Sequence, residues 1–437
     1  MKKIIIYLVF VLNLAAVIYL WFTGTSHYLL TSGTQSGILI AFGRLFGLLG
    51  EFFILLQLIL IGRITFVEQQ FGHDRLNQLH RWVGYGIALF FLGHPLLLTL
   101  GYGQASQTAF IPQFLDFLKN WEDVFKALLG LILFIIVIVT SIIIVKKRLR
   151  YETWHFTHMV MYIAIALVFG HQTNSGDLTS GSPLYYWMTL NFFVFGLILI
   201  FRWLRPLYRF YQQQFYIEKI VPETPGVFSI YLKGRDLKKY KFYPGQFANL
   251  TFLQRGMWFT HPFSFSAAPN GEYLRFSIKA SGDFTNKINS LKPGSKVIID
   301  GPLGVFTPAS AVKDKFLLIA GGIGITPIRA LAEHFAKEGK NIFLLYGMRT
   351  HQDITFKDEL EKLQLKYHFI LSEVIVAPGN GFGQGRINRE TIKQQVPDFL
   401  ERDIYLCGPT PMMKGILAEL KALGMPKKQI HYEKFNY

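Results

Sequence analysis

The sequence contains a single cysteine, Cys407, among its 437 residues. One cysteine excludes an internal disulfide and a structural zinc site built from cysteines. Charged residues are also scarce, at 17%, while hydrophobic residues make up 51%, more than an ordinary soluble protein carries. Almost all of this apolar excess lies before about residue 205. We therefore expect a membrane half and a soluble half that meet near residues 205–211.

Six apolar stretches in the first half are each long enough to cross a hydrocarbon core of about 30 Å. The first resembles a signal peptide in length, but it lacks a small-residue cleavage site and closes with Trp21 and Phe22, as a membrane helix would. The pattern predicts an all-α bundle of six transmembrane helices within residues 1–210. The expected helices cover 4–22, 37–61, 82–100, 124–145, 154–170 and 185–201.

Acidic residues are outnumbered, with 28 against 45 Lys and Arg, and the net charge is +17. The basic residues gather beside the apolar stretches, and the connecting segments between these clusters contain almost none. Segments 23–36 and 171–184 have no Lys or Arg, and 101–123 has only Lys119. This bias places both termini and the soluble half in the cytoplasm. It also accounts for the charge, so we expect a lipid bilayer and no nucleic acid as a partner.

Histidines inside membrane helices are costly and usually functional. The third helix carries His80 and His94, and the fifth carries His158 and His171, with His155 nearby. Spacings of 14 and 13 residues put one imidazole from each helix at two levels roughly 20 Å apart. This arrangement suits two stacked haems, each iron held by two histidines, although packing histidines remain the alternative. The 13-residue spacing requires a kink in the fifth helix, and choosing His155 makes the phase slightly worse.

Residues 215–306 alternate in polarity with a period of two and are rich in turn residues, which predicts a small β-barrel. Three phrases stand out: YPGQF at 243–247, HPFSFS at 261–266 and IKASGDFT at 278–285. The third combines a lysine, a glycine and a threonine before an expected helix, which favours binding of a phosphate. Each phrase taken alone is also compatible with ordinary turn chemistry.

From Lys315 onward, strands and helices alternate. A buried strand at 316–320 runs directly into the glycine-rich turn GGIGITP at 321–327. Two further strand ends carry the loops GMR at 347–349 and CGP at 407–409. Ligands of parallel sheets bind at the carboxyl ends of the strands, so these three loops should line one crevice. Cys407 has no histidine placed to activate it, which disfavours a nucleophilic role.

The six-helix layout with its two histidine pairs resembles the ferric reductase / NADPH oxidase family. The soluble phrases, in this order, resemble the FAD and nicotinamide domains of the ferredoxin-NADP reductase superfamily. These resemblances imply an FAD-binding β-barrel over 211–312 and an NAD(P)H-binding α/β domain over 313–437. They also imply two haems b, with His158 rather than His155 as a ligand.

By the same resemblance, the flavin ring is held by His261, Pro262, Phe263 and Ser264, with Ser264 near the reactive ring nitrogen. The FAD pyrophosphate region is assigned to Ile278, Lys279, Gly282 and Thr285. His261 and Lys279 stand where many soluble relatives have arginine. The nicotinamide cofactor is assigned to Gly321, Gly322, Gly324, Thr326, Gly347, Arg349, Cys407, Gly408 and Pro409. In the tail, Glu433 and Phe435 are expected beside the flavin, with Tyr437 as the second choice for the covering aromatic.

The expected function is that of an NAD(P)H oxidase. Electrons would pass from cytoplasmic NADPH, or from NADH, through FAD and the haems to oxygen at the outer face. A ferric-chelate reductase is the nearest alternative, and an electron-supply subunit for an extracytoplasmic protein is a more distant one. We expect activity without activating subunits, because the sequence shows no calcium-binding loop or docking extension.

Two positions on the second and third helices bear on the acceptor. Arg44 would form a buried ion pair with Glu51, or would bind a haem propionate and assist oxygen chemistry, as its resemblance to an oxidase arginine implies. Leu98 stands where the animal oxidases have a histidine, which weakens the case for oxygen as a specialised acceptor. The short outer loops 23–36 and 171–184 are expected to leave the outer haem largely uncapped.

Overall fold

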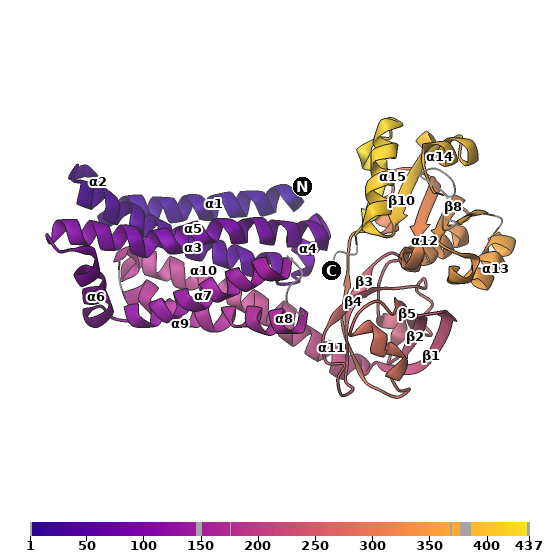
Figure 1. Cartoon of the computed structure of the whole chain (residues 1–437), viewed down its shortest axis with the longest axis horizontal. Helices are drawn as coiled ribbons and strands as arrows, with labels where there is room; N and C mark the ends of the chain where they lie inside the picture. The colour runs from indigo at the N-terminus through magenta and orange to yellow at the C-terminus, as the bar shows by residue number, and fades with distance from the viewer. Residues whose placement is uncertain (1, 146–150, 175, 368, 376–385, 435–437) are drawn as a thin grey trace. The chain divides into compact units, whose positions relative to one another are not determined.

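A computed structural model describes residues 2–145, 151–174, 176–367, 369–375 and 386–434 (Figure 1). The chain divides into two compact units. One consists of Met1–Gln70 and Arg75–Arg202, and the other of Phe71–Asp74 and Trp203–Tyr437. The division at Arg202 falls within a π-helical segment, Leu199–Leu204.

The first unit is helical (Figure 1). Six helical stretches in the part of the chain that the structure describes are long and apolar enough to span a membrane, which confirms the six-helix prediction. They are α1 (Lys2–Thr23), α3 (Gln35–Ile61), α5 (His73–Ala105), α7 (Val124–Val145), the pair α8 (Tyr151–Met159) and α9 (Met161–Asn174), and α10 (Gly181–Ile198), which continues toward α11 (Arg205–Gln213). Three short helices connect them: α2 (Thr25–Thr31), α4 (Thr65–Phe71) and α6 (Phe110–Asn120).

The third spanning helix is longer than its apolar stretch. It begins at His73, nine residues before the predicted start at residue 82. Residues 73–81 are mostly polar but contain no glycine or proline to end a helix, so the backbone continues where the hydropathy signal stops. As a result His80 lies well inside α5 and not at its end.

The fifth spanning segment is broken at Val160, between α8 and α9. Around this residue the backbone bonds tighten: Val160 N–H donates to Thr157 O and Ile163 N–H donates to Val160 O, each three residues back. Bonds of this kind are typical of a 3₁₀ turn and change the rotation per residue. The break confirms the distortion that the 13-residue histidine spacing required.

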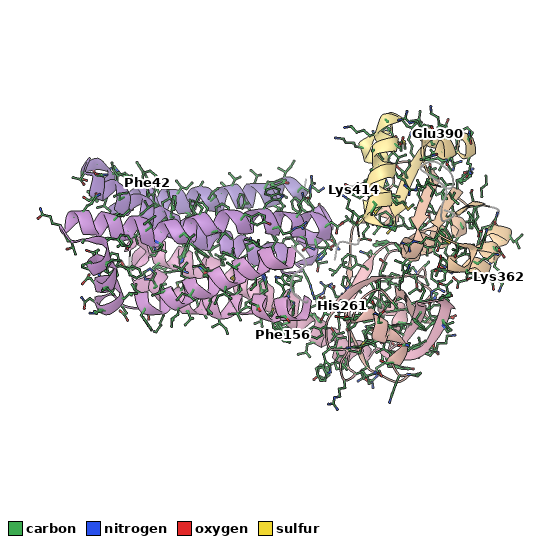
Figure 2. The ribbon with its side chains drawn as sticks, in the orientation of Figure 1. Phe42, Phe156, His261, Lys362, Glu390 and Lys414 are labelled. Atoms are coloured by element: carbon green, nitrogen blue, oxygen red, sulfur yellow. The ribbon has the colours of Figure 1, made fainter. Side chains whose placement is uncertain are left out.

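The surfaces of the two units differ in character. Phe42 and Phe156 on the helical unit are 42% and 66% exposed, as expected of side chains that face lipid. Lys362, Glu390 and Lys414 point outward from the second unit (Figure 2). Exposed charges of this kind require water, so the two halves are built for different solvents.

The second unit begins with two three-stranded antiparallel sheets, ordered β1-β2-β5 and β4-β3-β6. Apolar side chains from both sheets, among them Ile230, Leu250 and Phe276, fill the space between them. The strands are β1 (Tyr216–Thr224), β2 (Val227–Lys233), β3 (Phe247–Phe252), β4 (His261–Ser264), β5 (Leu274–Lys279) and β6 (Val297–Leu303). This is the β-domain that the period-two alternation predicted.

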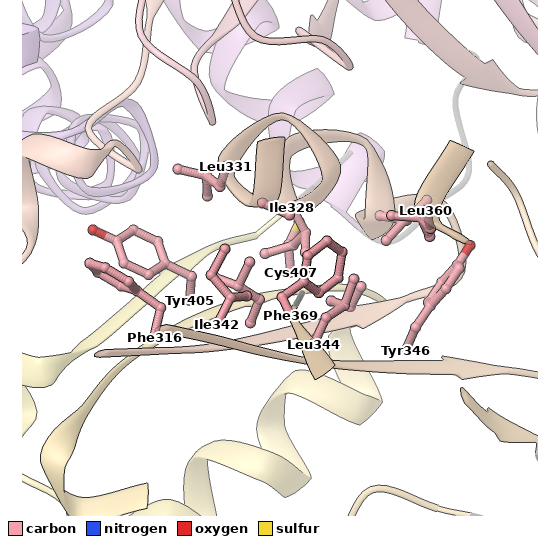
Figure 3. Packing of buried hydrophobic residues seen from close by; sticks show 14 of the residues in the cluster. Phe316, Ile328, Leu331, Ile342, Leu344, Tyr346, Leu360, Phe369, Tyr405 and Cys407 are labelled. Atoms are coloured by element: carbon pink, nitrogen blue, oxygen red, sulfur yellow. The ribbon is translucent and has the colours of Figure 1, made fainter. Parts of the chain in front are cut away.

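A five-stranded parallel sheet with the order β11-β10-β7-β8-β9 follows. Helices α12 (Ile325–Lys337) and α13 (Lys357–Tyr367) contribute to the core on one face, which Figure 3 shows around Phe316 and Tyr405. Helices α14 (Arg389–Gln395) and α15 (Thr410–Ala422) pack on the other face. The strands are β7 (Lys315–Gly321), β8 (Asn341–Met348), β9 (Ile370–Ile375), β10 (Arg402–Cys407) and β11 (Ile430–Glu433).

Candidate functional site

Two pairs of imidazole rings lie between α5 and the α8–α9 segment. The ring centres of His80 and His158 are 6.1 Å apart, and those of His94 and His171 are 6.0 Å apart. Two imidazoles that bind one metal ion from opposite sides, at about 2 Å each, hold their ring centres about 6 Å apart. Both pairs therefore have the separation that a shared metal ion requires.

The surroundings of His94 fix its tautomer. Its Nδ1 lies 2.8 Å from the carbonyl oxygen of Gly43 on α3, and a carbonyl can only accept, so Nδ1–H must donate. The other ring nitrogen, Nε2, then carries the lone pair that a metal needs. α3 comes so close here that a Cβ on Gly47 would lie 2.7 Å from His94 Nδ1.

The His80–His158 pair has fewer hydrogen-bond partners than His94 has. Nδ1 of His158 lies 3.3 Å from the hydroxyl of Ser141 on α7. Nδ1 of His80 is buried and has no hydrogen-bond partner among the described residues. These residues also contain no cluster of three or more His, Cys, Asp or Glu side chains that would hold a bare metal ion. Two facing imidazoles fit a haem, whose macrocycle supplies the remaining ligands.

A cavity lies beside His94 and His171, and we call it the His94 cavity. Apolar side chains from α6 and its C-terminal end, including Phe117 and Trp121, form part of its wall. The expectation of a largely uncapped region considered only loops 23–36 and 171–184, whereas segment 101–123 supplies part of this wall. The missed signal was the run of aromatic residues at positions 114, 117 and 121, whose spacing marks one face of an amphipathic helix.

Arg44 also lines the His94 cavity, but its partner is not the predicted Glu51. Its Nη1 donates to Asp177 Oδ1 at 3.0 Å, and its Nη2 donates to the hydroxyl of Tyr102 at 3.1 Å. The Asp177 side chain is only 3% exposed and also accepts from the Ser26 hydroxyl at 3.0 Å. Asp177 lies 133 residues from Arg44, beyond the reach of any helical spacing, so the sequence offered only Glu51 or a haem propionate as partners.

In the second unit, the phrase HPFS forms the whole of β4, paired with β3. Ser264 is buried, and its hydroxyl has no partner among the described residues. Pro262 and Phe263 lie opposite Asn249 and Ala248 of β3. A buried, unpartnered hydroxyl on a strand beside aromatic side chains fits contact with the polar edge of a planar ring.

The predicted pyrophosphate region lies at the end of β5. Ile278 is buried and Lys279 is exposed, and they are the last two residues of that strand. Thr285 opens the expected helix, which is a 3₁₀ helix, Thr285–Ser290. Its hydroxyl accepts the backbone N–H groups of Ser281 and Gly282 at 2.9 and 3.0 Å, which folds the loop back on itself.

The three loops predicted to bind the nicotinamide cofactor follow neighbouring parallel strands, β10, β7 and β8. Gly321 pairs in register with Gly347, and Cys407 pairs with Ala320. A Cβ on Gly408 would lie 3.1 Å from Gly321 N, so the first and third loops are in close contact. The turn after β7 includes Gly322 and Gly324, and α12 then begins with Ile325 and Thr326. In the other two loops, Arg349 is exposed after β8 and Pro409 precedes α15.

Cys407 ends β10 and is buried within the apolar core in Figure 3. Burial, reinforced by the negative charge of Glu433, raises the pKa of its thiol well above the usual range. Glu433 pairs in register with Cys407 at the end of β11. The two candidate covering aromatics, Phe435 and Tyr437, lie outside the described residues.

Comparison with known protein families agrees with this division. Residues 46–169 match the family described as a ferric reductase like transmembrane component. Residues 224–307 match an FAD-binding domain, and residues 318–417 match an oxidoreductase NAD-binding domain. The chain is a multi-pass membrane oxidoreductase. It joins a ferric-reductase-like membrane module to FAD- and NAD-binding domains.

Named relatives of this oxidoreductase align with about half of its length. A glycine betaine monooxygenase reductase subunit from Chromohalobacter salexigens is 30% identical over 230 residues, which are 50% of this chain and 62% of that protein. Flavohemoprotein B from Dictyostelium discoideum is 29% identical over 258 residues, 51% of this chain and 59% of its own length. The chain therefore spans about three fifths of the length of these curated relatives.

A solved structure is also similar to part of the oxidoreductase. The FAD/NAD-binding domain of a nitric oxide dioxygenase from Vibrio cholerae is 25% identical, with a TM-score of 0.45. The match covers 51% of this chain and 98% of that domain.

Because Cys407 is the only cysteine and is buried with a raised pKa, its thiol should react slowly in the folded oxidoreductase. We expect iodoacetamide at pH 8 to leave most of the native protein unlabelled, and to label one site per chain after denaturation. Intact-mass spectrometry measures both. Rapid labelling of the folded protein would contradict the burial of Cys407.

Proposed function

We propose that this oxidoreductase carries electrons from cytoplasmic NADPH through FAD and two bis-histidine haems b to an acceptor on the opposite face of the membrane. The observation that carries the proposal is the repeated pairing of imidazoles between the same two helical segments, at 6.1 and 6.0 Å. The flavin supplies the conversion between the two electrons of a hydride and the single electrons that haem iron accepts. Both termini and the FAD and nicotinamide domains lie on the cytoplasmic side.

Each cofactor is assigned to its own set of residues. His80 with His158, and His94 with His171, hold the two haems, while the Gly43 carbonyl orients His94. Residues 261–264 and 278–285 hold FAD. The glycine-rich turn at 321–326, Gly347, Arg349 and residues 407–409 hold the nicotinamide cofactor, with Glu433 and an aromatic of the tail beside the flavin. No activating subunit is required.

Oxygen is the proposed acceptor, reduced to superoxide. His94 and His171 would both hold the haem, which would supply single electrons to an acceptor near its edge. The apolar α6 side chains that wall the His94 cavity favour a small neutral molecule over a bulky charged chelate. Arg44 contributes positive charge there, and its ion pair with Asp177 neutralises part of that charge.

A ferric-chelate reductase is the second candidate. Leu98 lines the His94 cavity at the position where the resemblance to animal oxidases would call for histidine. The cavity thus lacks that donor for oxygen chemistry, and we expect loose specificity with both acceptors used.

Removing one histidine should remove one haem. We expect about two haems per chain in the purified protein, and about one in either His94→Ala or His158→Ala, because each change removes one of the two proposed ligands of one haem. Pyridine haemochrome assay measures the ratio. His155→Ala is the matched control, since His155 is a neighbouring histidine that the proposal does not use, and it should keep both haems. Full haem content in His158→Ala would contradict the assignment.

The electron donor is tested at Arg349. An exposed guanidinium after β8 can pair with the 2′-phosphate that distinguishes NADPH from NADH. Arg349→Ala should raise KM for NADPH roughly tenfold, as loss of a charge-assisted contact implies, and should change KM for NADH much less. Steady-state kinetics with both donors gives the comparison. Equal changes would remove Arg349 from phosphate recognition.

The acceptor is tested by comparing two reactions of the full-length protein. Superoxide dismutase should suppress most of the NADPH-driven reduction of cytochrome c in air. Phe117→Ala, which opens the α6 wall, should increase anaerobic ferric-chelate reduction severalfold. Ile111→Ala is the control on the same helix, where the side chain is 62% exposed and does not line the cavity. If dismutase has no effect while anaerobic iron reduction by the unmodified protein is fast, the reductase function replaces the oxidase.

A further inference from the structure

A fully buried arginine links the two domains of the second unit. Arg275 lies on β5 of the β-domain, and its side chain is 1% exposed. Its Nη1 and Nη2 donate to Oε1 and Oε2 of Glu359 at 2.6 and 3.0 Å. Glu359 belongs to α13 of the α/β domain. A buried guanidinium needs full pairing. Two of the five hydrogen bonds of Arg275 cross to Glu359, and the other three stay in the β-domain, on Ser266 and Tyr231.

A second arginine extends the contact. Nε of Arg329, on α12, lies 2.9 Å from Glu359 Oε2, and its Nη1 donates to Glu333 one turn further along the same helix. Glu333 in turn accepts the backbone N–H of Ala268 in the β-domain at 3.0 Å. Two arginines and two glutamates therefore form a row of alternating charges at the junction of the two domains. We call them the Arg275 cluster.

The charges in the cluster are kept ionised by one another. Burial by itself would raise the pKa of Glu359, but Arg275 and Arg329 outweigh burial and hold that pKa below its usual value. The pKa of Glu333 is lowered in the same way, chiefly by Arg329 against the opposing effect of burial. The cluster thus stays charged at neutral pH, and loss of Glu359 would leave Arg275 buried without a counter-charge.

The Arg275 cluster contacts both cofactor-binding segments. Arg275 Nη2 donates to the carbonyl of Ser266 at 2.6 Å, and its Nε donates to the Ser266 hydroxyl at 3.1 Å. Ser266 lies two residues after Ser264, in the chain that leaves β4. Arg329 lies three residues after Thr326, on the helix that follows the glycine-rich turn. The Arg275 cluster thus connects the segment after β4, which is predicted to hold the flavin, with α12, which follows the predicted nicotinamide-binding turn.

We propose that the Arg275 cluster is a positioning device that fixes the flavin strand against the nicotinamide-binding helix and thereby sets the rate of hydride transfer. The inference rests on the proposed use of these two segments for FAD and NADPH. Hydride transfer requires the two rings in van der Waals contact, and a displacement of about 1 Å can cost roughly a hundredfold in rate. None of the four side chains needs to touch a cofactor for this effect.

The test is Glu359→Gln in the purified full-length protein, because glutamine keeps the shape of the side chain and removes its charge. Anaerobic stopped-flow mixing with NADPH should show flavin reduction slowed about tenfold to a hundredfold. FAD content and the NADPH concentration at half-maximal rate should change less than about twofold, because the binding residues are intact. Glu359→Asp keeps the charge and should recover part of the rate.

A second readout does not depend on turnover. Hydrogen–deuterium exchange should become faster at Ala268 and in residues 325–333 of Glu359→Gln, because the domain junction loosens. The matched control is Asp398→Asn, which breaks a similar pair with Arg402 that lies entirely within the α/β domain, at 2.7 and 3.0 Å. It should leave both the flavin reduction rate and the exchange at the junction unchanged.

Three outcomes overturn the positioning role: a normal flavin reduction rate in Glu359→Gln, equal losses in Asp398→Asn, or loss of FAD together with the rate. The proposed haems and acceptor are tested separately, since reduction of the flavin by NADPH comes before any electron reaches them. If neither NADPH nor NADH reduces the flavin of the unmodified protein, both the positioning role and the proposed donor are wrong.

Discussion

The membrane unit depends on one constraint: nitrogen and oxygen groups placed in hydrocarbon must find partners within the bundle. Four imidazoles and an arginine are distributed among helices whose buried side chains are mostly apolar, with a few others that are polar, such as Glu51 and Asn191. Each histidine is set against a second histidine, and Arg44 is set against Asp177. Water cannot solvate these groups in the hydrocarbon, so their partners decide which helices lie next to one another.

Local backbone features make those pairings possible. The absence of side chains at Gly43 and Gly47 lets α3 approach α5, which brings a carbonyl within hydrogen-bond distance of His94. The break at Val160 changes the phase of the fifth segment, so that His158 and His171 both face α5 although an ideal helix would turn them apart. A regular helix with bulkier neighbours would bring at most one of the two pairs to a separation that a metal ion can bridge.

The second unit depends on a different constraint. Each of its two domains has its own apolar core, and the position of one domain against the other must also be fixed. Apolar packing also reaches the junction, where Phe306 joins the core of the α/β domain, and the Arg275 cluster adds polar contacts there. Charge-assisted bonds are directional, so they restrict angle as well as distance in a way that apolar contact does not. Ser264, buried with its hydroxyl unpartnered, lies at the edge of the segment that this cluster anchors.

The sequence by itself determined the six membrane helices, the β-domain and the parallel α/β domain, because hydropathy and periodicity depend on neighbouring residues. It also indicated which histidines share a level, since α-helical rise is constant, and it anticipated the distortion that appears at Val160. The assignments of cofactors to these residues stay predictions. Only the tertiary structure decided that Arg44 pairs with Asp177 and not with Glu51, and that α6 walls the cavity beside His94. It alone joined Arg275 to Glu359 across 84 residues. Contacts between distant segments depend on how whole elements pack, and no local spacing in the chain encodes them.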